Sequence, residues 1–136
     1  STATRPRTLN DQSNENVYER VGGLQWFDEL CSRFYERVAT DEVLRPLYPE
    51  DLEPSRYWLA LFLAQYWGGP GDYSTTRGHP RLRMRHAHLR VGVVERDRWY
   101  HHMAEAVSES QIDADLQEQM LAYFSMAATH LVNTPD

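Results

Sequence analysis

Apolar residues recur at helical spacing along most of this chain. Between residues 24 and 38 single apolar residues or adjacent pairs recur about every three or four positions: Leu24, Trp26 with Phe27, Leu30 with Cys31, Phe34 with Tyr35, and Val38. This spacing matches the 3.6-residue period of an amphipathic helix. Residues 17–21 precede a pair of glycines and are predicted to form a short, separate helical turn.

Three more segments are predicted to be helical. Residues 55–67, SRYWLALFLAQYW, are apolar on nearly every face, so this helix must be covered on more than one side. Residues 91–107 and 110–132 each carry one apolar stripe, and the positions expected to point inward are Val94, Trp99, Met103 and Val107 in the first and Leu116, Met120, Phe124, Ala127 and Leu131 in the second.

A shorter helix is expected through residues 41–48, where Asp41 can accept hydrogen bonds from the first free amides. No segment shows the alternation of a strand, and no internal repeat is present. The fold class is therefore all-α. We expect residues 1–15 to form a polar, disordered tail and residues 16–136 to form one domain.

The composition narrows the class of protein. Hydrophobic residues make up 41% of the chain, which favours a folded protein, and no apolar run is long enough for a membrane helix. The net charge of −6 argues against general nucleic-acid binding. Cys31 is the only cysteine and lies in an apolar stripe, so it is expected to be a buried side chain in a protein of the reducing cytoplasm.

Positive charge is concentrated in one part of the chain. All fourteen positive side chains are arginines, and half of them lie in residues 77–98: Arg77, Arg81, Arg83, Arg85, Arg90, Arg96 and Arg98. Forked cations at this density suit a bound carboxylate or phosphate, whereas the plainer interpretation is a solvated basic face. A helical binding module that grips an acidic partner through these arginines, without a cofactor, also stays open.

The same region contains a glycine-rich segment and several histidines. Residues 68–80 are predicted to form a long loop, followed by two turns of helix in PRLRMRHAH. The loop lacks the GxxxxGK[ST] pattern of a phosphate-binding loop. His86 and His88 are two residues apart, so on a helix they point away from each other and cannot share a zinc ion.

Haem requires only one protein ligand, because its macrocycle supplies four nitrogens. A lone histidine is more often structural, but the surroundings of His86 favour haem. Arginines on both sides suit its propionates, and the aromatic helix 55–67 suits its flat apolar surface.

The chain from about residue 16 to 134 resembles the group II truncated haemoglobins in their actinobacterial form. The matching pieces are VYERVGG, CSRFYERVATDEVLRPLYPED, FLAQYWGGPGDYSTTRGHPRLRMRHAHLR, ERDRW and MAATHLVN, in the family's order. The resemblance implies a shortened globin fold, with helices packed two over two around haem b.

It also implies roles for particular residues. His86 matches the iron ligand, and Tyr35, Tyr48 and Trp99 match the residues that stabilise the bound ligand. Ser55 and Leu59 match positions on the distal helix, while Tyr73 and Arg85 match positions that meet the propionates. The remaining residues expected to touch the cofactor are Phe62, Leu63, Trp67 and Met84.

These roles predict that ferrous haem on His86 binds dioxygen and small anionic ligands. For Tyr35 and Trp99, ordinary core packing is the alternative. Ligand retention by hydrogen bonds suits redox chemistry, scavenging or sensing better than bulk oxygen transport. The alternatives are a nitric-oxide dioxygenase or a pseudo-peroxidase, and turnover would require a separate reductase, because no flavin or nicotinamide motif is present. The exposed aromatics of residues 55–67 leave a homodimer open.

Overall fold

The computed structural model describes residues 15–78 and 81–134, and within these ranges every regular element is helical. The predicted tail therefore lies almost wholly outside the described residues. The elements are α2 (Val17–Val21), α3 (Leu24–Val38), the 3-10 helix η1 (Arg45–Leu47), α4 (Glu53–Tyr66), α5 (Asp72–Arg77), α6 (Leu82–Arg85), α7 (Val93–Ser108) and α8 (Ala114–His130). No helix among the described residues is both long and apolar enough to span a membrane.

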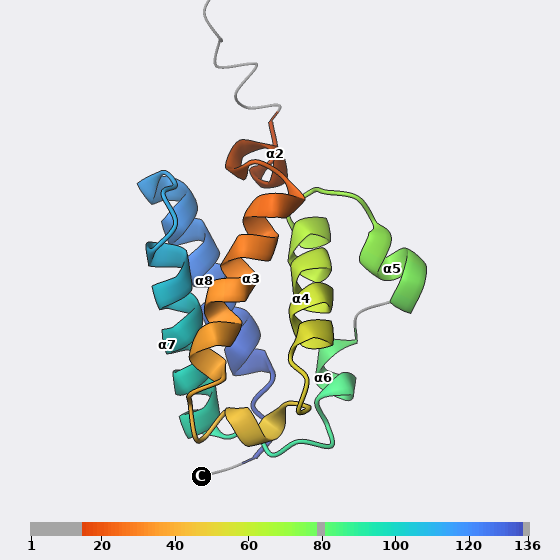
Figure 1. Ribbon diagram of the computed structural model, residues 1–136, viewed down its shortest axis with the longest axis vertical. Coiled ribbons are helices and arrows are strands. Elements are labelled where there is room, and N and C mark those ends of the chain that lie inside the picture. The colour runs from red at the N-terminus through yellow and green to blue at the C-terminus, as the bar shows by residue number, and fades with distance from the viewer. Residues whose placement is uncertain (1–14, 79–80, 135–136) are drawn as a thin grey trace, which may run out of the picture.

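The long helices α3, α4, α7 and α8 carry the architecture (Figure 1). Helix α3 packs against both α4 and α7, and α7 packs against α8. The short helix α5 packs against α4, on the side away from α7 and α8. The all-α prediction is confirmed, and the long helices form the two pairs expected of a two-over-two globin fold.

The core is built from the stripes that the sequence pattern identified. In α3, Phe27, Leu30, Cys31, Phe34 and Val38 are fully buried. The other helices contribute Leu63, Ala64, Met103, Val107, Met120 and Phe124 to the same cluster. Burial raises the pKa of the Cys31 thiol far above its ordinary value, in agreement with the expectation that it is a packed side chain.

Two glycines at the end of α4 explain how the chain leaves this helix. Gly68 has a φ of +105°, which favours glycine, and its carbonyl accepts a bond of 3.1 Å from Asn16 Nδ2. Gly69 does not have a positive φ. Gly69 instead permits a close approach, because a Cβ there would lie 2.6 Å from the Tyr18 ring. These contacts fasten α2 to the end of α4.

Several details differ from the sequence predictions, and the helix expected through residues 41–48 is reduced to the 3-10 helix η1. The expected loop 68–80 contains helix α5, whose residues DYSTTR carry no apolar stripe for a periodicity search to find. The helix before His86 is only four residues long and ends at Arg85. Val94 is 55% exposed rather than inward, because it lies in the first turn of α7, before the helix meets the core.

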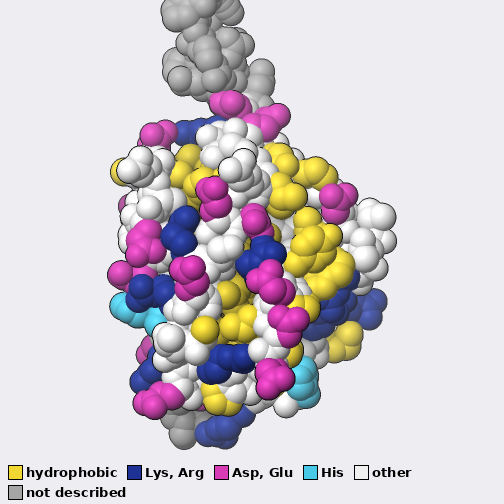
Figure 2. All heavy atoms as spheres, viewed as in Figure 1, with side chains coloured by type: hydrophobic (Ala, Val, Ile, Leu, Met, Phe, Trp, Pro, Cys, Tyr) yellow, Lys and Arg dark blue, Asp and Glu magenta, His cyan; other side chains and the backbone are white. Residues whose placement is uncertain are grey.

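Helix α4 is covered on several sides but not on all. Tyr57 and Tyr66 are each 51% exposed, and Figure 2 shows hydrophobic side chains on the surface over this helix. Its buried residues, among them Leu61, Leu63 and Ala64, face neighbouring helices. The apolar pattern all round α4 therefore combines a core face, an exposed face and the face described next.

Candidate functional site

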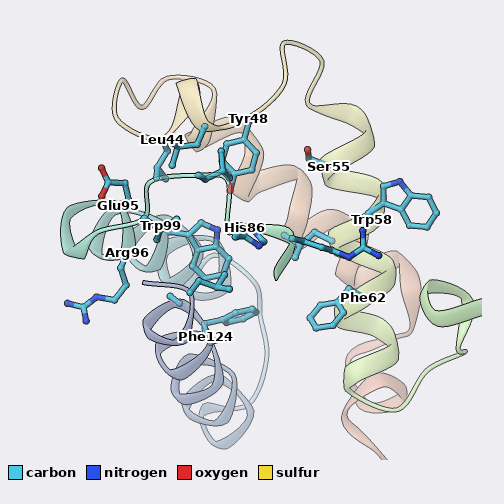
Figure 3. Close-up of a pocket in the computed structure, with 18 of the residues that line it drawn as sticks. Leu44, Tyr48, Ser55, Trp58, Phe62, His86, Glu95, Arg96, Trp99 and Phe124 are labelled. Carbon is cyan, nitrogen blue, oxygen red and sulfur yellow. The ribbon is translucent and has the colours of Figure 1, made fainter. Parts of the chain in front are cut away.

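A cavity of about 410 Å³ lies between α4, α7, α8 and the segment that follows α5. In Figure 3, the α4 side chains Ser55, Trp58 and Phe62 lie on one side of it and Trp99 and Phe124 on the other. Its volume falls within the usual range for small-molecule and cofactor sites. Most of the lining is apolar.

One face of α4 forms a wall of this cavity. The residues on that face are Ser55, Trp58, Leu59, Phe62 and Leu63. They are spaced by three and one, which places them on a single stripe of the helix. Tyr73 of α5 extends this wall, because it is buried and its ring lies 5.4 Å from that of Phe62.

His86 brings an imidazole to the cavity directly after α6 ends. It is half-buried, and Leu89 N donates to its carbonyl at 3.0 Å, which closes a turn around it. His88 also lines the cavity but is exposed. His79 lies outside the described residues.

Arginines lie at the border of the cavity. Arg77, Arg85 and Arg96 are all among the lining residues. The Arg77 guanidinium sits 4.9 Å from the centre of the Trp58 ring, a cation–π arrangement that holds it against the aromatic wall. Arg85 donates to the Arg77 carbonyl at 3.1 Å, which links the two arginines.

Tyr35, Tyr48 and Trp99 meet at the cavity from three different elements. Tyr35 comes from α3, Tyr48 follows η1, and Trp99 belongs to α7. The Tyr35 and Tyr48 rings are perpendicular, with centres 5.5 Å apart. Side-chain hydrogen bonds connect Tyr48 with the Trp99 indole, which can only donate, and with Tyr35, whose raised pKa indicates that its hydroxyl is the donor.

Burial keeps both tyrosines protonated. Burial raises the pKa of Tyr48 to about 12, although its bonds with Trp99 and Tyr35 act in the opposite direction. Burial also raises the pKa of Tyr35 well above its ordinary value, and the neighbouring Tyr48 and Cys31 add to the effect. Both hydroxyls are therefore neutral hydrogen-bond donors near pH 7.

A buried carboxylate holds the corner that carries Tyr48. Asp41 Oδ1 accepts from the amides of Val43 and Leu44 at 2.8 and 2.9 Å, as its expected capping role requires. Its other oxygen lies 2.7 Å from His102 Nε2 and 3.3 Å from an Arg98 nitrogen. Because both partners belong to α7, Asp41 fastens the corner before Tyr48 to the helix that carries Trp99.

The hydrogen bonds of Asp41 are expected to make part of the free energy of unfolding depend on pH in the acid range. Burial alone would raise its pKa, but the bonds from His102, the two amides and Arg98 outweigh burial and lower it. A lowered pKa stabilises the fold above the unfolded-state value of about 3.9, and this contribution is lost as the pH falls toward the folded-state pKa. We expect Asp41→Asn to lower the free energy of unfolding by about 1.5–3 kcal/mol at pH 7 and by progressively less below about pH 4.

Urea unfolding at several pH values measures this difference. Asp113→Asn is the matched control, because Asp113 forms an exposed ion pair with Arg20 at 3.3 Å and surface pairs contribute little. Equal effects of the two substitutions would contradict the role given to Asp41.

Most of the residues predicted from the sequence line this one cavity. The lining includes Tyr35, Tyr48, Ser55, Leu59, Phe62, Leu63, Tyr73, Arg85, His86 and Trp99. Two predicted residues are not brought there. Trp67 is packed between Phe27 and Phe124 in the core, with ring centres 6.0 and 5.6 Å away, and Met84 is 60% exposed.

Other lining residues were missed as cofactor contacts. Trp58 lies on the α4 side, and Leu89, Val91 and Phe124 lie elsewhere around the cavity. The helical spacing of Trp58 with Leu59 and Phe62 was the signal that could have placed it on the wall. Leu89 and Val91 offered no such signal, since they lie outside regular helices.

The residues at this site fit haem. The cavity combines an imidazole, an aromatic wall and guanidinium groups at its border, which correspond to the iron, the macrocycle and the propionates. Across residues 15–78 and 81–134, no three His, Cys, Asp or Glu side chains gather as a metal site. An iron centre here would draw most of its ligands from the macrocycle, and the imidazoles that line the cavity are those of His86 and His88.

Comparisons with known proteins support the same assignment. The bacterial-like globin family matches residues 16–133. The Group 2 truncated hemoglobin YjbI of Bacillus subtilis is 34% identical over 122 residues, which cover 90% of this chain and 92% of that protein.

Solved structures agree in fold. A thermostable hemoglobin from Thermobifida fusca is 53% identical, with a TM-score of 0.87, over 90% of this chain and 100% of that one. The group II truncated hemoglobin of Bacillus anthracis is 31% identical, with a TM-score of 0.85, over 89% and 98% of the two chains. The chain therefore belongs to the bacterial-like globin family, within the group II truncated haemoglobins, and its cofactor is haem b.

Proposed function

We propose that this protein holds haem b through His86 and retains dioxygen by a hydrogen bond from Tyr48, whose hydroxyl is oriented by Trp99 and Tyr35. The family supports binding of small ligands such as dioxygen at haem. The observation that carries the finer proposal is the convergence of two donors on the Tyr48 oxygen, at the cavity that His86 also lines.

That convergence limits the partners to which the Tyr48 hydroxyl can donate its hydrogen. A phenolic hydroxyl has one hydrogen to donate and two lone pairs to accept with. When Trp99 and Tyr35 occupy the lone pairs, the Tyr48 hydrogen is directed to a third partner. In a cavity with an apolar lining, a polar ligand is the partner that fits.

Bound ferrous haem b supplies an iron that takes one small ligand. His86 supplies the imidazole on the protein side, and its turn is closed by the bond from Leu89 N. Arg77 and Arg85 supply positive charge for the propionates, while Phe62, Leu63 and the other apolar residues exclude water. Tyr48 donates to the ligand, and Trp99 and Tyr35 orient its hydroxyl.

Such a donor set favours retention over delivery. A hydrogen bond to a charged or strongly dipolar acceptor contributes about 1.5–3 kcal/mol, so each bond slows ligand loss by roughly 10- to 100-fold. Redox chemistry, scavenging or sensing fits slow release better than bulk oxygen transport. The arginines alone would also suit an acidic partner, but the cavity beside them favours haem.

Reconstitution with haem tests the proposal. We expect stoichiometric haem to give a Soret band, and the ferrous form to release dioxygen slowly in a stopped-flow experiment. A chain that takes up no haem would overturn the whole proposal. Uptake of haem with rapid release of dioxygen would overturn only the part that concerns Tyr48, Trp99 and Tyr35.

A further inference from the structure

Asn133 joins the end of the chain to the turn that contains His86. Its Nδ2 donates to the carbonyls of Leu89 and His86 at 2.9 and 3.3 Å. Its Oδ1 accepts from the Val91 amide at 3.0 Å. One side-chain amide thus binds three backbone groups in residues 86–91.

Neighbouring groups hold this amide in a single orientation. The backbone amides of Asn133 and Thr134 both donate to the Val91 carbonyl, at 2.8 and 3.2 Å. The Thr134 hydroxyl donates to Asn133 Oδ1 at 2.8 Å. Exchanging the oxygen and nitrogen of Asn133 would set an oxygen against two carbonyls, so the assigned orientation is the only consistent one.

The segment around His86 requires support of this kind. Helix α6 is four residues long, far below the length at which a helix persists by itself. The carbonyls at the end of a helical turn have no partner within it. The His86 carbonyl already accepts from Leu89 N, and Asn133 adds a second donor there and supplies one to the Leu89 carbonyl. Asn133 therefore caps the turn from outside.

We propose that Asn133 is a positioning residue for His86, which ties the orientation of the iron ligand to the C-terminal end of α8. The inference rests on the proposed role of His86 as that ligand. Asn133 acts through the backbone, and one of its two Nδ2 bonds ends on the carbonyl of His86 itself. Leu131, two residues earlier, lines the same cavity as Leu89 and Val91, so this end of the chain also closes the pocket.

If Asn133 only stabilised the fold, its replacement would have a different effect from the one expected of a positioning residue. It would lower the stability of the fold without altering the bond between His86 and iron. The positioning role predicts altered iron–histidine coordination in a protein that is still folded.

The decisive substitution is Asn133→Asp, which keeps the shape and the acceptor but removes both Nδ2 donors. We expect haem loss to a haem acceptor to accelerate about 10-fold, the lower end of the range for groups that orient a metal ligand, because Asn133 is exposed to water. We also expect the iron–histidine stretching band of the ferrous protein to shift or broaden in resonance Raman spectra.

Thr134→Val is the matched control, because it removes one bond to Asn133 Oδ1 and leaves both Nδ2 bonds. Its haem loss and Raman band should equal those of the unmodified protein. Asn133→Gln keeps every group on a side chain one methylene longer, and we expect it to lie between the control and Asn133→Asp. If the aspartate variant does not fold, the glutamine variant provides the test through the same band.

An unchanged band and unchanged haem loss in Asn133→Asp and Asn133→Gln, with only a lower unfolding midpoint, would overturn the positioning role. If His86 is not the iron ligand, the experiment gives a different result. In that case the unmodified protein itself would bind no haem, or would show an iron–histidine band that persists in His86→Ala.

Discussion

Replacing His86 with alanine is expected to destroy tight haem retention. The substitution removes the cavity imidazole that follows α6 and fits the role of iron ligand. Loss of a group that only orients a metal ligand costs 10- to 100-fold in affinity, so loss of the ligand itself should accelerate haem transfer by more than about 100-fold. Transfer to an excess of a haem-free acceptor protein, followed at the Soret band, measures the rate.

His88 provides the matched control. It lines the same cavity two residues away but is exposed, so His88→Ala should keep haem at nearly the original rate. Added imidazole should restore part of the original spectrum in His86→Ala by occupying the vacated space. Haem loss in His88→Ala with retention in His86→Ala would refute the assignment.

The second large effect is expected from Tyr48→Phe, which removes the hydroxyl that accepts from Trp99 and Tyr35. One lost hydrogen bond to the ligand corresponds to dioxygen release about 10- to 100-fold faster. Trp99→Phe and Tyr35→Phe should each accelerate release less. Each of them removes a group that orients the Tyr48 hydroxyl but leaves that hydroxyl in place. Stopped-flow displacement of dioxygen by carbon monoxide measures the rates.

The three donors form one network, so their effects should not add. Once Tyr48 is phenylalanine, Trp99→Phe should change the rate less than it does in the unmodified protein. Tyr123→Phe is the control, because Tyr123 also lines the cavity and its pKa is also raised to about 12 by burial, but it takes no part in this network. Equal rates in the unmodified protein, the single variants and the double variant would remove the hydrogen-bond account.

The raised pKa of Tyr48 also predicts how the rate of dioxygen release depends on pH. Because the folded-state pKa is about 12, the hydroxyl keeps its proton throughout the neutral and mildly alkaline range. Release of dioxygen should therefore be constant from about pH 7 to about pH 10, the ordinary pKa of tyrosine. A rate that rises through this interval would mean that Tyr48 ionises there and is not held as described.

The apolar periodicity of the sequence determined much of this protein. It determined the long helices, because a stripe such as that of Phe27, Leu30 and Phe34 can be buried only on one helical face. The sequence also points to His86 as the iron ligand, because arginines flank it, an aromatic helix precedes it, and it matches the ligand position of the family's motif. Helix α5 was not predictable in this way, because its residues DYSTTR form no stripe.

Only the tertiary structure decided which side chains meet. Trp67 has the aromatic character expected of a cavity wall, but it packs into the core, while Arg77 reaches the cavity and stacks on Trp58. Tyr35, Tyr48 and Trp99 lie far apart in the chain, and their contact depends on the packing of α3 and α7 and on the corner held by Asp41. The partners of Asn133 lie more than forty residues away. Local spacing specifies each helix and its buried face, whereas hydrogen bonds between distant segments are determined only when those helices pack.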